Sequence, residues 1–373
     1  MKIKVLSLEI ENFKGIKHLY CEFSDTTKVY GANAAGKTTM FDAFWWLLFN
    51  KDSHGVEKFN IRPLGKNGKP IDHLEIKVTS VIKVDDKPYM FSKTQRQKWK
   101  DDIFFGNENL YEIDGYAISE RRYKECISEI IDEEIFKLLV NPNYFTSLKW
   151  KEQREILMRL VDDGIDYDII EKLGYSELRD ELRKAPSVED IHKKYSKQAS
   201  DIKKKLAELP IRLSEVGVLH GMMMDITEPF KKRMNHIRQE QRDLSQMMAD
   251  AERVVFMLEE FTKAKSIRVN KEVNKYFDGV EFNLSETLVN GTVKEGCEVT
   301  VDGVPFKSLN SGHRIVAGLH IIKALQKLYE AEVPIWLDNA ETVSISNLPE
   351  LNGQKILLYV AENKELKLEA VNE

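Results

Sequence analysis

The stretch at residues 30–39, YGANAAGKTT, constrains the fold more than any other part of the chain. Residues 31–38 fit the pattern G-x-x-x-x-G-K-[ST], in which backbone N–H groups and the positive end of the following helix meet phosphate oxygens. The glycines let the backbone approach a phosphate without a Cβ in the way. The pattern predicts that Lys37 reaches the β- and γ-phosphates and that the Thr38 hydroxyl helps to hold Mg²⁺.

The residues on either side of this loop support the P-loop interpretation. Val29 and Tyr30 end a short apolar run that predicts a strand, and residues 38–49 predict a helix with an apolar face. The alternative is a glycine-rich turn before an amphipathic helix, but strand, loop and helix agree with a P-loop. The expected nucleotide-binding residues of the loop are Gly31, Asn33, Ala34, Ala35, Gly36, Lys37, Thr38 and Thr39.

Composition narrows the class of protein. The chain has 373 residues, enough for two or three domains, and its 31% of charged residues suggests a soluble protein with exposed helix. The net charge of −5 gives no global nucleic-acid signature, so any DNA contact must use local patches. The cysteines Cys21, Cys126 and Cys297 lie far apart, which disfavours both a disulfide framework and a cysteine zinc site.

The N-terminal residues and the apolar runs of the chain give no indication of a membrane. The first five residues, MKIKV, lack the apolar region of a signal peptide, and no apolar run approaches the length of a membrane span. We therefore expect a cytoplasmic protein with no membrane partner.

The sequence predicts strands followed by helices in the first half of the chain, and strands around one helix near its end. Two strands surround a turn at residues 12–15, and a β-meander occupies residues 60–118, with turns at 85–87 and at Asp114-Gly115. Helices are predicted at residues 119–139, 147–161 and 168–183. Strands return at 280–284, 288–293 and 297–301, a helix runs to Tyr329, and buried strands are expected at 333–338 and 356–360.

A heptad pattern separates the two halves. Apolar residues recur every three or four positions over 188–216 and again over 230–258, which predicts an antiparallel coiled-coil hairpin with arms roughly 40–55 Å long. Pro210 should kink or interrupt the first arm. The alternative is two core helices of an ordinary helical domain, but polar faces such as residues 203–205, KKK, favour exposure.

An apolar run that ends at Asp338 supplies the expected partner of the P-loop. Its carboxylate should lie beside the Mg²⁺ ion that Thr38 helps to hold, and contact that ion through water. Thr38 and Asp338 are therefore the predicted metal-site residues.

Together these motifs resemble the ATPase head of the SbcC-type DNA-repair proteins, within the SMC/RecF group of ABC ATPases. Residues 8–15, LEIENFKG, resemble the opening strand of that group, and residues 31–39 match its Walker A motif. Asn310, Ser311 and Gly312 stand where its nucleotide-contacting signature should be, and residues 337–341, LDNAE, stand at Walker B. Residues 45–52, 141–154 and 338–341 resemble phage and prophage ATPases of this type.

The resemblance implies an α/β fold of the ABC-ATPase head type, in which two lobes are joined by a coiled-coil insertion. The N-terminal lobe would comprise residues 1–185, the hairpin 186–270 and the C-terminal lobe 271–373. It also implies ATP and Mg²⁺ as cofactors, a homodimer in which two heads enclose ATP, double-stranded DNA, and a separate nuclease subunit of the SbcD type. The hairpin is short for this family and lacks the C-x-x-C zinc hook.

Several positions depart from the family pattern. Asn310 replaces the signature serine, and Asn339 stands where many relatives carry the glutamate that activates water. An amide orients water but cannot accept its proton, so Glu341 is the nearby acid and the candidate base. The switch histidine is replaced by residues 360–362, VAE, and Asn141 and Asn143 lie where a glutamine is expected. These departures favour slow hydrolysis, with Lys37, Asp338, Glu341 and Asn339 as the expected catalytic residues.

The leading hypothesis is thus an ATPase subunit of a DNA-processing complex, active in exonuclease, repair or recombination work, that regulates a separate nuclease. A structural DNA clamp or tether that binds ATP without hydrolysing it is one alternative, which Asn339 favours. An unrelated P-loop kinase is another, which the coiled-coil insertion and the second-lobe Ser-Gly helix disfavour.

Overall fold

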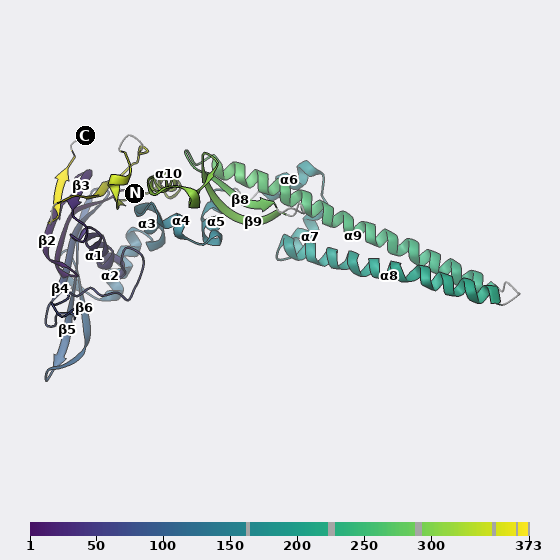
Figure 1. Cartoon of the computed structure of the whole chain (residues 1–373), viewed down its shortest axis with the longest axis horizontal. Helices are drawn as coiled ribbons and strands as arrows, with labels where there is room; N and C mark the ends of the chain where they lie inside the picture. The colour runs from purple at the N-terminus through teal and green to yellow at the C-terminus, as the bar shows by residue number, and fades with distance from the viewer. Residues whose placement is uncertain (162–164, 223–227, 288–292, 345–347, 363–364, 372–373) are drawn as a thin grey trace. The chain divides into compact units, whose positions relative to one another are not determined.

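The computed structural model describes residues 1–161, 165–222, 228–287, 293–344, 348–362 and 365–371. The chain forms two compact units (Figure 1). The first comprises Met1–Gln153, Tyr276–Glu281 and Glu298–Glu373, and the second comprises Arg154–Lys275 and Phe282–Cys297. Among the described residues, no helix combines the length and the apolar character that crossing a membrane requires.

The first unit contains a six-stranded antiparallel sheet. Its order is β2-β1-β4-β5-β6-β7, so the predicted β-meander is present as β4 to β7. Asp85, Asp114 and Gly115 have positive φ angles of 51°, 53° and 81°, which suits the tight turns between these strands. The strands are β1 (Ile3–Phe13), β2 (Ile16–Glu22), β4 (Ile76–Val84), β5 (Lys87–Lys100), β6 (Ile103–Ile113) and β7 (Tyr116–Ile118).

A second sheet in this unit carries the P-loop strand. Its order is β11-β12-β3-β13, where β11 (Ile335–Leu337), β12 (Lys355–Val360) and β3 (Thr26–Gly31) are parallel and β13 (Lys367–Ala370) is antiparallel to β3. Strand β13 was not predicted. Because parallel strands end at the same edge, the residues that follow β3, β11 and β12 are brought together.

Helix α1 (Lys37–Phe49) follows β3 and is buried on more than one face, unlike the one-sided helix predicted from the sequence. It contacts strands of both sheets. Trp336 of β11 stacks on Phe41 and Phe44 of the helix, with ring centroids 4.7 and 5.6 Å apart. This aromatic contact explains why an apolar helix, rather than an amphipathic one, stands after the loop.

The remaining helices of the first unit are shorter than predicted. The expected helix at 119–139 is two helices, α2 (Glu120–Ile130) and α3 (Glu133–Val140), because Ile131 and Asp132 are extended and the Asp132 carboxylate caps α3. The other elements are α4 (Tyr144–Ser147), α5 (Trp150–Met158), which continues into the second unit, β10 (Val304–Pro305), η1 (Phe306–Ser308), α10 (Ser311–Tyr329) and η2 (Ala340–Thr342).

The second unit is mainly helical. The predicted helix at 168–183 is two helices, α6 (Ile165–Leu173) and α7 (Leu178–Lys184). Strand β8 (Glu281–Thr287) is followed by β9 (Val293–Val301), and most of the strand predicted at 288–293 lies outside the described residues.

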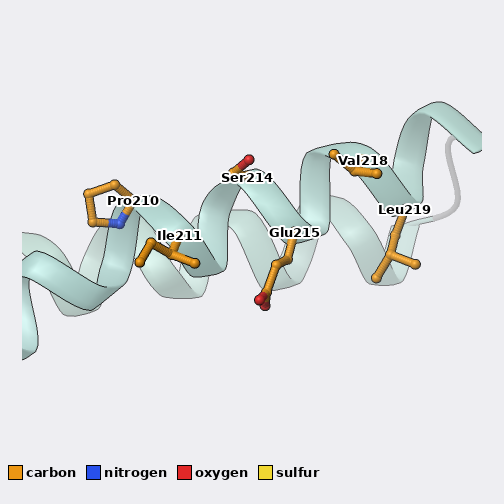
Figure 2. A pocket seen from close by; sticks show the side chains of 6 residues that line it. All are labelled: Pro210, Ile211, Ser214, Glu215, Val218 and Leu219. Atoms are coloured by element: carbon orange, nitrogen blue, oxygen red, sulfur yellow. The ribbon is translucent and has the colours of Figure 1, made fainter.

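Two long helices, α8 (Val188–Met222) and α9 (Glu228–Asn274), run side by side (Figure 1). Their shared core contains Leu209, Val216 and Ile237, each at most 2% exposed. Pro210 does not interrupt α8. Its ring lies on the outer surface next to the exposed Ile211, and the exposed Val218 lies farther along the same helix (Figure 2). These side chains border a shallow apolar pocket. Because Pro210 is exposed, the helix hydrogen bond that it cannot donate lies away from the core between the two helices. This position limits the cost of a proline inside α8.

Candidate nucleotide-binding site

The loop between β3 and α1 has the backbone geometry of a phosphate cradle. Gly36 has φ 105° and Ala34 has φ 66°, so the chain turns sharply just before the helix begins. Gly36 suits this position because a side chain is strained at such a φ angle. Asn33, Ala34 and Thr38 are exposed, so the loop is open to a ligand beside the start of α1.

Lys37 holds its ammonium group inside this loop. The side chain is 8% exposed, and its Nζ atom donates to the carbonyl oxygens of Gly31 at 2.7 Å and Ala32 at 3.0 Å. Within the described part of the chain, Lys37 forms no ion pair. Its positive charge is thus available to an anion that enters the loop.

Asp338 lies beside the P-loop, although the two are 300 residues apart. The Thr38 hydroxyl donates to Asp338 Oδ2 at 3.3 Å, and the Asn339 N–H donates to Asp338 Oδ1 at 2.9 Å. The carboxylate follows β11, which is buried and parallel to β12, and β12 is parallel to β3. An exposed hydroxyl and a half-buried carboxylate are the hard oxygen donors that Mg²⁺ prefers, so these two residues fit a Mg²⁺ site.

Asn339 and Glu341 occupy the turn after Asp338. Asn339 is exposed with φ 56°, and its carbonyl accepts from both the N–H and the hydroxyl of Thr342. Glu341 is exposed, and its Oε2 atom accepts from the Val360 N–H at 3.2 Å, at the end of β12. The Glu341 carboxylate, predicted as a base, therefore also binds the carboxyl end of β12, an inner strand of the sheet.

The signature-like residues open α10. The Asn310 side chain caps this helix by accepting from the His313 N–H at 2.9 Å, and Ser311 is exposed at its first turn. Within the described residues, no hydrogen bond joins Asn310, Ser311 or Gly312 to the P-loop of the same chain. At the start of α10, Asn310 and Ser311 are exposed and Gly312 is half-buried, and the first N–H groups of a helix have no partner within it.

Sequence reasoning missed the polar anchors of α1. The buried Asp42 carboxylate accepts from Lys14 Nζ at 2.7 Å and from the Ser53 hydroxyl at 2.6 Å. At the other end, Lys93 of β5, which is 1% exposed, donates to the Trp46 carbonyl at 3.0 Å and to Asn50 Oδ1 at 2.6 Å. Burial lowers the pKa of Lys93 to about 7.

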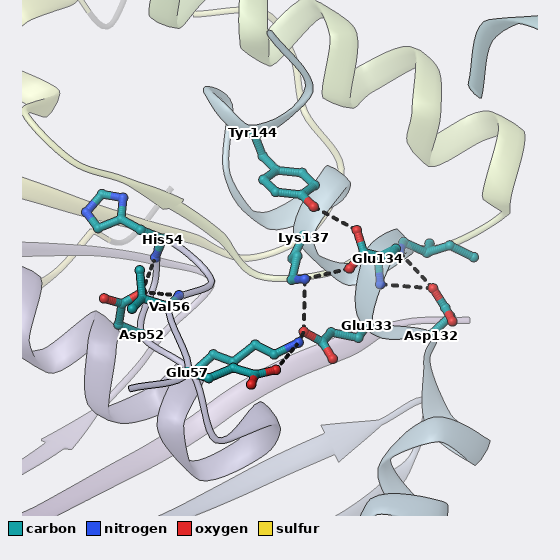
Figure 3. Close-up of polar contacts among 11 residues, drawn as sticks. Asp52, His54, Val56, Glu57, Asp132, Glu133, Glu134, Lys137 and Tyr144 are labelled. Atoms are coloured by element: carbon teal, nitrogen blue, oxygen red, sulfur yellow. Dashed lines mark hydrogen bonds and ion pairs between the residues drawn. The ribbon is translucent and has the colours of Figure 1, made fainter. Parts of the chain in front are cut away.

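A chain of charges then connects the end of α1 with α3 and α4 (Figure 3). Lys51 pairs with Glu133 at 2.7 Å, and Lys137 lies between Glu133 at 2.9 Å and Glu134 at 2.6 Å. The Tyr144 hydroxyl completes the network by donating to Glu134 Oε2 at 2.7 Å. Lys137 is largely buried, so the two carboxylates compensate its charge. The segment that holds Asn141 and Asn143 is thereby tied to the P-loop helix.

Comparison with solved structures finds resemblances at low identity. The chain is similar to the Smc head domain with an extended coiled coil bound to the C-terminal domain of ScpA from Pyrococcus furiosus, at 13% identity and a TM-score of 0.44, covering 99% of this chain and 96% of that chain. It is also similar to the Smc head domain with a coiled coil and joint from Pyrococcus yayanosii, at 13% identity and a TM-score of 0.40, covering 99% and 97%.

A third similar structure is the recombination mediator protein RecF with ATP, at 13% identity and a TM-score of 0.36, covering 96% of this chain and 94% of that chain. No curated protein matches the chain. The family model described as "AAA domain" matches residues 7–252, which include the P-loop. The chain therefore belongs to the AAA-domain family and carries an AAA-type ATPase domain.

Proposed function

We propose that the chain is an ATPase head of the SMC/RecF type, and within that group of the SbcC type, with a short coiled-coil hairpin formed by α8 and α9. The observation that carries the proposal is the contact of Thr38 with Asp338 at the mouth of a P-loop whose lysine has no carboxylate partner among the described residues. That arrangement supplies oxygen donors for Mg²⁺ and a cation for the β- and γ-phosphates of ATP.

Each residue of the site has a role in this proposal. Lys37 neutralises the β- and γ-phosphates, the N–H groups that open α1 bind phosphate oxygens, and Thr38 and Asp338 would hold Mg²⁺. Bound there, the ion would offset the negative charge of the triphosphate. Asn339 would orient the attacking water through its amide, and Glu341 would accept the proton.

The proposed base is open to a direct test. The Val360 N–H holds Glu341 through its Oε2 atom, so Oε1 is the oxygen that would accept the proton. Glu341→Gln should lower the steady-state rate of phosphate release by roughly tenfold or more while nucleotide affinity is retained. If Glu341→Gln keeps the parental rate, Glu341 is not the base, and an increased rate in Asn339→Glu would assign water activation to position 339.

We further propose that ATP joins two chains through their heads. The N–H groups of Ser311, which is exposed, and of Gly312, which is half-buried, would contact the γ-phosphate that the other chain's P-loop holds, and ADP lacks that group. Light scattering with a non-hydrolysable ATP analogue should therefore show a dimer, and ADP should leave a monomer. A strict monomer at high protein concentration, with the analogue demonstrably bound, would exclude this arrangement.

The DNA role rests on the second unit. Lys203, Lys204 and Lys205 are all exposed on α8, and only Lys204 has an ion pair among the described contacts, a long one of 3.9 Å to Asp201. These lysines would meet DNA phosphates, and a nuclease subunit of the SbcD type would cleave the DNA. Filter binding of duplex DNA should weaken steeply with salt. Absent or salt-independent binding would identify the lysines as a solvated helix face.

A non-hydrolysing DNA clamp is the second candidate function. Asn339 favours it, because an amide at this position cannot accept a proton. Saturating ATP that drives dimerisation with no measurable phosphate release, with or without DNA, would decide for the clamp.

A further inference from the structure

Gly312 lies against the turn that follows Asp338, in the same chain. A Cβ atom built on Gly312 would stand 2.7 Å from the Thr342 carbonyl oxygen, closer than real Cβ contacts allow. Because the obstructing atom belongs to the backbone, no side-chain rotation can make room for it. The absence of a side chain at position 312 therefore has a reason inside the single chain, separate from any contact with a nucleotide.

The turn that Gly312 contacts is held together by its own hydrogen bonds. The Thr342 N–H and hydroxyl both donate to the Asn339 carbonyl, at 3.0 and 2.8 Å, and the Val343 N–H donates to Ala340 at 3.3 Å. The Asn339 N–H in turn holds Asp338, which meets Thr38. A displacement of Thr342 would therefore move Asn339, which it bonds, and with Asn339 the Asp338 carboxylate that the Asn339 N–H holds.

Helix α10 cannot easily move aside to relieve such a displacement. Further along the helix, a Cβ on Gly318 would lie 2.0 Å from the Pro142 carbonyl oxygen, so the helix backbone already touches another backbone there. Pro142 belongs to the segment beside Tyr144, which the Lys137 and Glu134 contacts hold in place (Figure 3). Extra volume at position 312 is thus relieved mainly by the turn at 340–342.

We propose that Gly312 is a positioning residue for Mg²⁺: its bare backbone seats the 340–342 turn and thereby sets the Asp338 carboxylate beside Thr38. The N-terminus of α10 is consequently coupled to the metal site of its own chain. The inference rests on the proposed function for the presence of Mg²⁺ and nucleotide. It differs from a phosphate contact in trans, because it predicts an effect in a chain that has no partner.

The test measures Mg²⁺ affinity in the chain of 373 residues as a monomer. Fluorescent ADP is bound to the parental protein and to Gly312→Ala, and Mg²⁺ is titrated. Gly312→Ala should weaken the apparent Mg²⁺ affinity about fivefold or more, while ADP affinity in excess EDTA stays within about twofold of the parental value. Gly217→Ala is the matched control, because a Cβ at that helical glycine meets nothing within 4 Å and should change neither quantity.

A second variant keeps the proposal testable if Gly312→Ala does not fold. Thr342→Val removes the hydroxyl bond to the Asn339 carbonyl at an exposed position, and should weaken Mg²⁺ affinity in the same direction by a smaller factor. Unchanged Mg²⁺ affinity in the folded variants would overturn the inference, and loss of ATP-driven dimerisation alone would leave Gly312 as a phosphate contact. No Mg²⁺-dependent ADP binding by the parental protein would instead refute the proposed function.

Discussion

Two regions of the molecule are each stabilised by a different kind of contact. One is the fold around the P-loop in the first unit, and the other is the α8–α9 hairpin in the second. At the P-loop, Thr38 meets Asp338 across 300 residues. At the opposite end of the same parallel strands, the Gln354 side chain bonds to both the N–H and the carbonyl of Val5 across 349 residues. In the hairpin, Leu209, Val216 and Ile237 pack at heptad spacing along two helices that are adjacent in the chain.

The difference shows that specific polar partners fix the side chains around the P-loop, whereas apolar packing stabilises the helix pair. Buried polar groups at the P-loop end have specific partners, so their removal should change function or folding as a whole. The hairpin core is a narrow apolar seam between largely exposed faces, so its changes should remain local. The following predictions test that contrast, from the largest expected effect to the smallest.

Lys37→Ala should produce the largest loss. The substitution removes the ammonium that Gly31 and Ala32 hold in the loop, and Mg·ATP affinity should fall by more than about a hundredfold while the melting temperature changes little. Isothermal titration calorimetry measures the Mg·ATP affinity, and Lys17→Ala, at an exposed position of β2, is the control. Unchanged affinity in a folded Lys37→Ala protein would refute the P-loop assignment.

Ile237→Ala should weaken the hairpin alone. Ile237 is 2% exposed against Leu209 and Val216, so its truncation should cost about 2–4 kcal/mol of local stability. Hydrogen exchange should show reduced protection in α8 and α9, with nucleotide affinity preserved. Ile211→Ala, at a 63% exposed position on α8, is the control and should leave protection unchanged. A loss of nucleotide affinity in Ile237→Ala would show that the two regions are not independent.

Lys93 should make the stability of the first unit depend on pH. Burial lowers its pKa from 10.5 to about 7, so between these values the folded chain binds fewer protons than the unfolded chain. Stability should therefore rise with pH across this window, with a slope approaching about 1.4 kcal/mol per pH unit from this group.

Urea unfolding at several pH values measures the Lys93 slope, and Lys93→Met should lose this component. Lys87, which is exposed at the start of the same strand, offers the control variant Lys87→Met, which should keep the slope. Equal slopes in the parental protein and Lys93→Met would contradict the prediction.

Glu240→Gln should have the smallest effect. Its carboxylate pairs with Arg212 across the hairpin at 3.1 Å, but the two side chains are 33% and 48% exposed. Solvent and salt screen such a pair, so the loss should stay below about 1 kcal/mol and vanish in high salt. Thermal unfolding followed by circular dichroism at two salt concentrations measures it, and a larger, salt-independent loss would show that the hairpin also relies on specific polar contacts.

Local patterns predicted much of this architecture. The heptad spacing predicted the paired helices α8 and α9, and the turns at Asp85 and Asp114 predicted the antiparallel meander. Lys93 carried a usable signal, because it shares a strand face with the apolar Tyr89 and Phe91, yet the pattern could not reveal its acceptors. The break at Asp132 was missed because periodicity continues across it, whereas a side-chain cap ends and restarts the helix.

The sequence by itself determined the P-loop, the order of strand, loop and helix around it, and the acid at the end of a later apolar run. These follow from residue type and short-range spacing, which act on the backbone directly. The sequence also predicted that Asp338 shares a site with Thr38, and the tertiary structure supplied the direct contact between them. Only the tertiary structure decided that Glu341 binds Val360 and that Gly312 packs against the turn at 340–342. Those contacts depend on parallel strand register and on backbone approach within a few ångströms, which no spacing along the chain specifies.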